Sequence, residues 1–584
     1  MMRGLLMRGV AIVLAGMSVL GVGAGRCAAQ APLEPGQMPP RTLFYLIWRG
    51  MPSAEARKQN ALFGLWDDAD FAPMRTGMVE VLMSDTKKEK EKPTVTKEEM
   101  ASYVSLLDNA FVAGYVPKPP TVANTAGARE EKAARPWNGL FLVYDRSGKE
   151  EILSKAMLRM NSGGSEIPKL SQVTIAGVAA LKVERKSGTN YYAETGKYAV
   201  SAVEERVLEE ILNRLKGKGG SISLAQSKAY LEAKPLLGGG ILEFFARMPN
   251  SREIAGATAD SGPQAKLLLN AIKLDSIHVL AGHVIVDGAK TRVQGGILGD
   301  TAAGSLFDVW AEGEATPVSL AYVKPETVYY NESQVNLLGI YKTIKRAMTQ
   351  GGPGANTKQI ADTVEKAAEE RIGMPLTEAL GMTSGEVSAI QTSPSLEASK
   401  KVYMLGIRDK EGALKLTRSM FGDRISSEKQ DGSTTYLKVS LGSGARSAGT
   451  AQWNFFYVAV TPDLMIGSMK SEPLRELLAR QAKEGAGGVP KNILEARSQF
   501  PAKLNGFSYF DFQKVDWAGL KANWIADANK ATKEAKSTDD AAMSRKYADW
   551  LGQVKPEVFA RHFHVMTGAS WKDEKGVQFD EWLQ

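Results

Sequence analysis

The chain has 584 residues and a formal charge of +8, with 43% hydrophobic and 24% charged residues. This composition is typical of a folded globular protein and excludes an intrinsically disordered one. The positive excess is weak for a chain of this length, and no basic patch interleaved with aromatic residues is visible, so we expect no nucleic-acid partner.

The first 29 residues have the features of a secretory signal peptide. Arg3 and Arg8 provide the positive start, residues 10–20 are an apolar core, and small residues around Ala29 offer a cleavage site. The apolar run is much shorter than the roughly 20 residues that span a bilayer. We therefore expect residues 1–29 to be a cleavable signal peptide and the protein to be periplasmic or extracellular. No second long apolar run follows, so we expect no transmembrane segment.

Cys27 is the only cysteine of the sequence. A lipid-modified cysteine normally follows small residues, whereas Arg26 precedes Cys27, and this argues against a lipid anchor. Cleavage after Ala29 would leave a mature chain without cysteine. Such a chain can form neither a disulfide nor a thiolate metal site.

Hydrophobic patterning predicts short strands and helices in the first part of the mature chain. The expected strands are 42–46, 111–116, 139–144 and a hairpin across 191–203, and the expected helices are 61–66, 98–107, 150–160, 208–212 and 224–233. Two stretches, 84–99 and 117–136, are rich in charge and proline, so we expect surface loops there.

A similar series of elements is predicted for the rest of the chain. The expected strands are 327–330, 387–391, 402–407, 455–460 and 464–469, and the expected helices begin at 336, 410 and 471 and cover 493–499. Asp409 is a good N-cap for the second of these helices. Residues 517–550, rich in Ala and Lys, are expected to form either a helical pair or one interrupted helix.

Sequence matches between the two parts of the chain predict an internal duplication. The strongest match joins 278–294 to 564–578, where a His-Val start, a glycine, an aspartate turn and a Val-Gln return recur in order. We therefore expect an α+β protein of two internally duplicated halves, 40–312 and 318–584. Each half is expected to be mainly an antiparallel sheet with helices on one face, ending in a long hairpin.

Four motifs resemble a family of exported bacterial proteins of unknown function built from tandem α+β units. They are P-x-x-T-L-x-Y at 39–45, D-K-E-x-A-L at 409–414, V-x-P-D-L-x-I-x-S at 460–468 and S-E-x-L-R-E-L-L at 471–478. The resemblance covers most of the mature chain. It implies an exported protein without an assigned activity, so it transfers no functional residue.

The four histidines are the first candidates for chemistry: His278, His283, His562 and His564. On a strand, His562 and His564 would share one face, a spacing that zinc can use, with Glu557 or Asp573 as the nearest third ligand. However, His564 matches His278 in the internal comparison, and the position two residues before His278 is Ser276. We therefore interpret these histidines as repeated hairpin residues and predict no metal site.

Other candidate motifs are also better interpreted as structural. No G-x-S-x-G element occurs, the glycine-rich stretch 351–358 lacks the spacing of a phosphate loop, and Gly238 to Gly240 precede a strand rather than a helix. Adjacent acidic residues are interpreted as solvated helix positions; they are Asp67-Asp68, Glu204-Glu205 and Glu369-Glu370. Trp48 beside Arg49 is the one aromatic residue for which we expect a surface role.

No catalytic, cofactor-binding or metal-binding residue is therefore assigned, and no cofactor is expected. The absence of a catalytic constellation favours a soluble, non-enzymatic cell-envelope protein that binds an unidentified ligand or envelope partner across a two-lobed concave surface. The alternative is a secreted or periplasmic hydrolase whose carboxylate or histidine site the sequence does not reveal. A pocket where at least three polar or titratable side chains converge would favour the enzyme.

Overall fold

The computed structural model describes residues 30–584, except 84–101, 118–137, 163–167, 186–187, 250–272, 314–315, 351–354, 442–454, 485–487 and 536. The expected signal peptide lies outside the described residues, and so do the two expected surface loops apart from Pro117.

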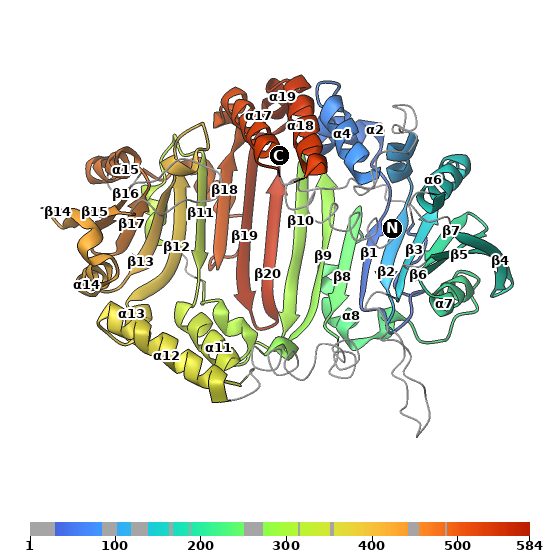
Figure 1. The fold of residues 1–584 in the computed structure, drawn as a ribbon, viewed down its shortest axis with the longest axis horizontal. Helices are drawn as coiled ribbons and strands as arrows, with labels where there is room; N and C mark the ends of the chain where they lie inside the picture. Colours follow the sequence, from blue (N-terminus) through green and yellow to red (C-terminus); the bar gives the residue numbers. More distant parts are fainter. Residues whose placement is uncertain are drawn as a thin grey trace.

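In the described part of the chain, twenty strands form one continuous antiparallel sheet (Figure 1). From one edge to the other the strands are β4 (Lys169–Ile175), β5 (Val178–Arg185), β6 (Gly188–Thr195), β7 (Tyr198–Ala202), β3 (Leu140–Asp145), β2 (Phe111–Tyr115), β1 (Phe44–Trp48), β8 (Leu242–Arg247), β9 (Ile277–Asp287), β10 (Lys290–Gly299), β20 (Gly576–Leu583), β19 (Val565–Asp573), β18 (Gly506–Asp511), β11 (Tyr329–Gln334), β12 (Thr383–Gln391), β13 (Val402–Ile407), β17 (Leu464–Ser468), β16 (Phe455–Val460), β15 (Thr434–Ser440) and β14 (Ile425–Asp431).

The expected architecture of two duplicated halves, 40–312 and 318–584, each with its own sheet, is wrong. Strands β10 and β20 pair from Thr291–Leu583 to Leu298–Gly576, and this pairing joins all the strands into one sheet. An outer hairpin strand carries unpaired backbone N–H and C=O groups, and pairing the two hairpins satisfies them. Outward from this pair, β9, β8 and β1 follow on one side, and β19, β18 and β11 on the other.

One side of the sheet, which we call the packed face, carries the two largest hydrophobic clusters. Side chains alternate between faces along a strand, so Tyr45 and Ile47 of β1 point to this side. They belong to a cluster that includes the buried stripe of helix α7 (Glu205–Leu215), at Leu208 and Ile211. In the other cluster α15 (Ser471–Glu484) and α16 (Lys491–Arg497) cover strands β11–β13 and β16–β19.

Helices also pack on the opposite side of the sheet. Phe63, from α3 (Ala61–Asp67), packs against Leu46 and Trp48 of β1, which alternate with the residues of the packed face. The expectation of helices on one face is therefore wrong. Trp48 is buried and its indole N–H donates to the carbonyl of Leu107, 2.8 Å away, so the expected surface role of Trp48 is wrong too.

The remaining helices lie mainly along two opposite margins of the sheet (Figure 1). Along the upper margin lie α2 (Ala54–Gln59), α4 (Ala72–Met83), α17 (Trp517–Glu534), α18 (Thr538–Gln553) and α19 (Glu557–His562), and along the lower margin α8 (Lys228–Ala233), α11 (Leu337–Gln350), α12 (Ala355–Ile372) and α13 (Leu376–Gly381). Helices α6 (Glu150–Ser162) and α14 (Lys410–Phe421) lie near the two ends of the sheet. Residues 517–550 thus form two helices rather than one.

Within the described part of the chain, no helix combines the length and the apolar character needed to span a membrane.

Candidate functional site

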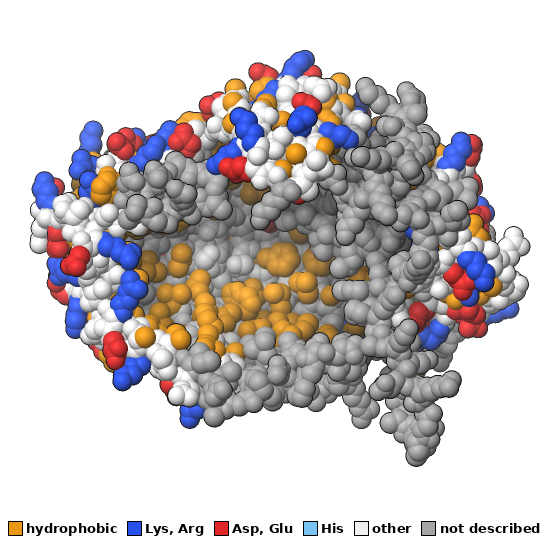
Figure 2. Space-filling model, viewed as in Figure 1, with side chains coloured by type: hydrophobic (Ala, Val, Ile, Leu, Met, Phe, Trp, Pro, Cys, Tyr) orange, Lys and Arg blue, Asp and Glu red, His pale blue; other side chains and the backbone are white. Residues whose placement is uncertain are grey.

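The side of the sheet opposite the packed face is hollowed, and we call it the open face. Figure 2 shows hydrophobic side chains across the floor of this hollow, and Figure 1 shows helices along the upper and lower margins of the sheet. Three large hydrophobic residues of this face keep a substantial exposed fraction: Leu280 on β9 (39%), Val387 on β12 (39%) and Tyr403 on β13 (45%). An exposed apolar surface of this kind on a folded protein indicates an interaction site.

Strand register shows which residues make up this floor. One row across the sheet joins Val293, Glu581, Gly568, Ser508, Asn331, Ala389 and Tyr403. The next row joins Gly295, Phe579, Ser570, Gly506, Ser333, Val387 and Leu405. Large apolar side chains therefore alternate with glycines and small polar residues. Because the small residues project little from the sheet, the surface over these strands lies close to the backbone.

Glycines let aromatic rings lie close to the sheet on this face. A Cβ atom at Gly282 would stand 2.4 Å from the Phe244 ring, and a Cβ at Gly295 would stand 2.6 Å from the Phe579 ring. Real Cβ atoms do not approach other atoms so closely, so any side chain at these positions would push the rings upward. The glycines thus help to form the hollow.

A carboxylate and an ammonium with shifted pKa values stand on this mainly apolar face. Glu581 lies in the row of Tyr403, and the removal of water by the surrounding protein raises the pKa of its carboxyl group. Lys401 lies one position before Val402, and its ammonium is 4.4 Å from the centre of the Tyr329 ring. Partial burial lowers the pKa of Lys401. Among the described residues, its ammonium has no acidic partner.

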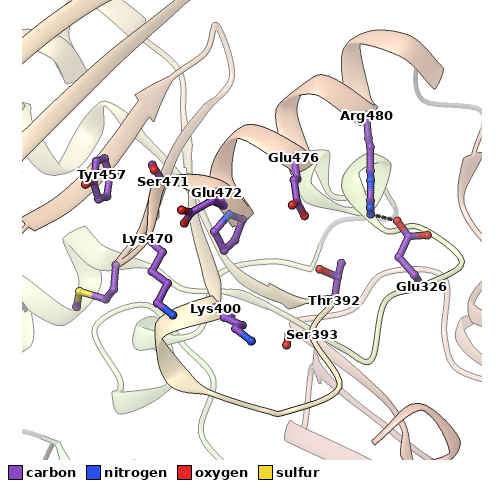
Figure 3. A pocket seen from close by; sticks show the side chains of 12 residues that line it. Glu326, Thr392, Ser393, Lys400, Tyr457, Lys470, Ser471, Glu472, Glu476 and Arg480 are labelled. Carbon is purple, nitrogen blue, oxygen red and sulfur yellow. Dashed lines mark hydrogen bonds and ion pairs between the residues drawn. The ribbon is translucent and has the colours of Figure 1, made fainter. Parts of the chain in front are cut away.

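A second cavity, of about 740 Å³, lies beside the start of α15 (Figure 3). Its lining is rich in charge, and its three cations are already paired. Arg480 forms an ion pair with Glu326, and the ammonium groups of Lys400 and Lys470 lie 3.3 and 3.8 Å from the Glu397 carboxylate. Such pairing is typical of a solvated surface and leaves little positive charge for recognition of a ligand.

The histidines do not form the arrangement considered for zinc. His562 is the last residue of α19, so His562 and His564 do not share a strand face. The Nε2 atom of His562 lies 2.9 Å from Asp68, whereas His564 is exposed. No cluster of three or more His, Cys, Asp or Glu residues able to hold a metal ion, whether with Glu557, Asp573 or others, occurs in the described ranges.

The other two histidines contact single groups. His278 lies 3.1 Å from Glu232, and the Nδ1 atom of His283 lies 2.8 Å from the backbone carbonyl of Leu236. The environments of His278 and His564 therefore differ, although both stand near the start of a strand of a closing hairpin.

The remaining sequence candidates have structural partners. Asp67 pairs with Arg57, Glu204 with Arg206, and the Glu369 carboxylate accepts from the backbone N–H of Leu376. Residues 238–240 precede β8, as expected. Of the stretch 351–358, residues 355–358 form the start of α12, and 351–354 lie outside the described residues.

No protein-family model, curated protein or solved structure matches the chain. The resemblance to exported tandem-unit proteins therefore stays a prediction, and the site is defined by its geometry alone.

Strand β13 carries a sequence signal for the open face. Strand β13 is apolar at nearly every position, and strands that are covered on both faces have this pattern. In the structure, Val402 and Met404 are buried on the packed face, whereas Tyr403 is exposed on the other. An apolar strand with one uncovered face is the feature that marks this site.

Proposed function

We propose that the protein is an exported binding protein that holds an extended apolar ligand on the open face of its sheet. The observation that carries this proposal is the exposure of Leu280, Val387 and Tyr403 on one hollowed surface. Ligand sites are concave and mainly apolar, with a few polar groups that fix orientation. The open face has these properties.

Export is part of the proposal and rests on the amino-terminal residues. A positive start, a short apolar core and small residues before position 30 are typical of a cleavable secretory signal. A periplasmic or extracellular location would suit a carrier of apolar molecules, because such molecules need a protein surface to cross an aqueous space.

The geometry favours binding over hydrolysis. Glu581 and Lys401 are the carboxylate and the ammonium with shifted pKa values on the open face, and five strand-to-strand steps separate β20 from β13. At about 4.8 Å a step this is roughly 24 Å along the sheet. Two groups so far apart cannot act together on one reacting atom.

A fluorescence titration with the apolar dye N-phenyl-1-naphthylamine tests this proposal on purified protein. Wild-type protein should bind the dye, and Val387→Asp should weaken binding about tenfold or more, a loss of about 1.4 kcal/mol, because it places a charge on the floor. The control is Leu494→Asp, on α16. Leu494 is also exposed (45%) but lies away from the open face. Equal weakening by both variants, or no binding by the wild type, would contradict the proposal.

A further inference from the structure

Lys400 and Lys401 are neighbours in the chain but stand in different surroundings. Lys400 lines the cavity beside α15 (Figure 3), and its ammonium also contacts Glu397. Lys401 precedes Val402, a residue of the packed face, by one position and therefore points to the open face. Its ammonium over the Tyr329 ring confirms this direction, since Tyr329 pairs with Phe510 and Gln391 in the outermost row of that face.

The Lys401 ammonium is partly desolvated without a counter-ion among the described residues. The aromatic ring of Tyr329 compensates only a part of the lost hydration. A cation in such a place costs free energy unless an anion pairs with it. An anionic group arriving from the open face would supply that partner.

Two tyrosines lie on the same face as this ammonium: Tyr329, whose ring it contacts, and Tyr403, two positions further along the chain. Burial raises the pKa of Tyr329, and the nearby Tyr403 raises it further. Tyr403 is 45% exposed and belongs to the open face. One ammonium and two phenol hydroxyls suit an oxyanion with a single negative charge.

Apolar side chains continue directly from this cluster. Val387 and Leu405 occupy the next positions on the open face of β12 and β13, and Tyr329 makes an edge contact with Phe510, with ring centres 5.9 Å apart. A ligand anchored at Lys401 would therefore lay its remaining length on apolar surface.

We propose that Lys401, Tyr329 and Tyr403 bind the carboxylate of a long-chain fatty acid whose acyl chain lies on the open face. This inference rests on the proposed function, because it requires the apolar surface to hold the chain. A single ammonium without a guanidinium favours a carboxylate over a phosphate monoester, whose double charge calls for more cations.

The test compares three amphiphiles with the same sixteen-carbon chain (hexadecanoate, hexadecanol and hexadecyl phosphate) by displacement of the bound dye. Wild-type protein should bind hexadecanoate about tenfold more tightly than hexadecanol. Lys401→Met should remove this preference and leave the affinity for hexadecanol unchanged. The matched control, Lys400→Met, should keep the preference, because Lys400 faces the other cavity.

A smaller effect is expected from Tyr403→Phe, which removes one hydroxyl and should reduce the preference for the acid by a few fold. Thermal denaturation of each variant shows whether it folds, and Lys401→Gln provides a second substitution that keeps a polar side chain.

The outcomes separate the two proposals. Failure of all three amphiphiles to bind would overturn the apolar site itself. Equal binding of acid and alcohol by the wild type, or a preference that survives Lys401→Met, would overturn the head-group site alone. Tighter binding of hexadecyl phosphate than of hexadecanoate would overturn the assignment to a carboxylate.

Discussion

The two faces of the same strands carry similar apolar residues but differ in how far these residues are buried. On β13, Val402 and Met404 are buried beneath helices, while Tyr403 between them is 45% exposed. On β12, Ile390 is buried on the packed face and Val387 is exposed on the open one. The hydrophobic effect thus stabilises the fold on one face, whereas on the other the apolar surface remains available to a ligand.

Ionisable groups follow the same contrast. On the packed face Glu332 is paired with Arg497 and accepts the hydroxyl of Tyr330, and burial raises the pKa of Glu332 even beside that arginine. On the open face, Glu581 and Lys401 have no such network among the described residues. Ion-pair networks of this kind are typical of a structural core, and charged groups with shifted pKa values on a concave surface are typical of a site.

The largest loss of stability should come from breaking the Glu332–Arg497 network of the packed face. Arg497→Met leaves the Glu332 carboxyl buried without its cation and should lower the free energy of unfolding by about 3–5 kcal/mol. Urea denaturation measures this loss. Arg480→Met removes the exposed pair with Glu326 and should cost only about 0–1 kcal/mol. A loss below 1 kcal/mol for Arg497→Met would mean that the network contributes little.

A smaller difference in stability is expected between substitutions on the two faces of a single strand. Ile390→Val should cost about 0.5–1.5 kcal/mol, because it removes a methylene group from a closely packed cluster. Val387→Ala, three positions earlier on β12, should stay within about 0.5 kcal/mol of the wild type. Urea denaturation of both variants checks this. A larger loss for Val387→Ala would show that another part of the chain covers the open face.

The smallest effect concerns Glu581 and depends on pH. Glu581 is exposed to water, but the surrounding protein removes part of its hydration and raises its folded-state pKa above the unfolded value of about 4.3, so the fold slightly disfavours the charged form. Below about pH 4.3 the Glu581 carboxyl is protonated in both states, and its contribution to the free energy of unfolding is at its maximum. This contribution is lost as the pH rises through the folded-state pKa. Glu581→Gln should therefore slightly raise the melting temperature at pH 7 and leave it unchanged near pH 3.5.

The comparison for this variant is Glu574→Gln, in the exposed turn between β19 and β20. Its melting temperature should follow the wild type at both pH values. If Glu581→Gln lowers the melting temperature at pH 7, the carboxylate has a stabilising partner and the open face is not as described here.

Local elements were predictable from the sequence where one pattern dominates. The apolar runs at 402–407 and 455–460 became β13 and β16, and the stripe at Leu208 and Ile211 became the buried side of α7. Asp409 caps α14 as expected, since its carboxylate accepts from the Gly412 N–H. Local periodicity and caps depend on neighbouring residues, so they can be found in a sequence.

The global sheet and the candidate site could not be predicted in the same way. The pairing of β10 with β20 joins residues far apart in the chain. The sequence of an edge strand does not specify which other strand will pair with it. Lys401 looks like its neighbour Lys400 in the sequence. Only the alternation of side chains in a strand of known register separates the lysine of the open face from the lysine paired with Glu397.

The central place of β20 has a consequence for how the protein assembles as it is made. Residues 576–583 emerge long after β10, yet they lie beside it in the middle of the sheet. Until they arrive, β10 is an unprotected edge to which other strands, including those of neighbouring chains, can pair. Nascent or truncated chains lacking these eight residues should therefore need chaperones more than the finished protein does.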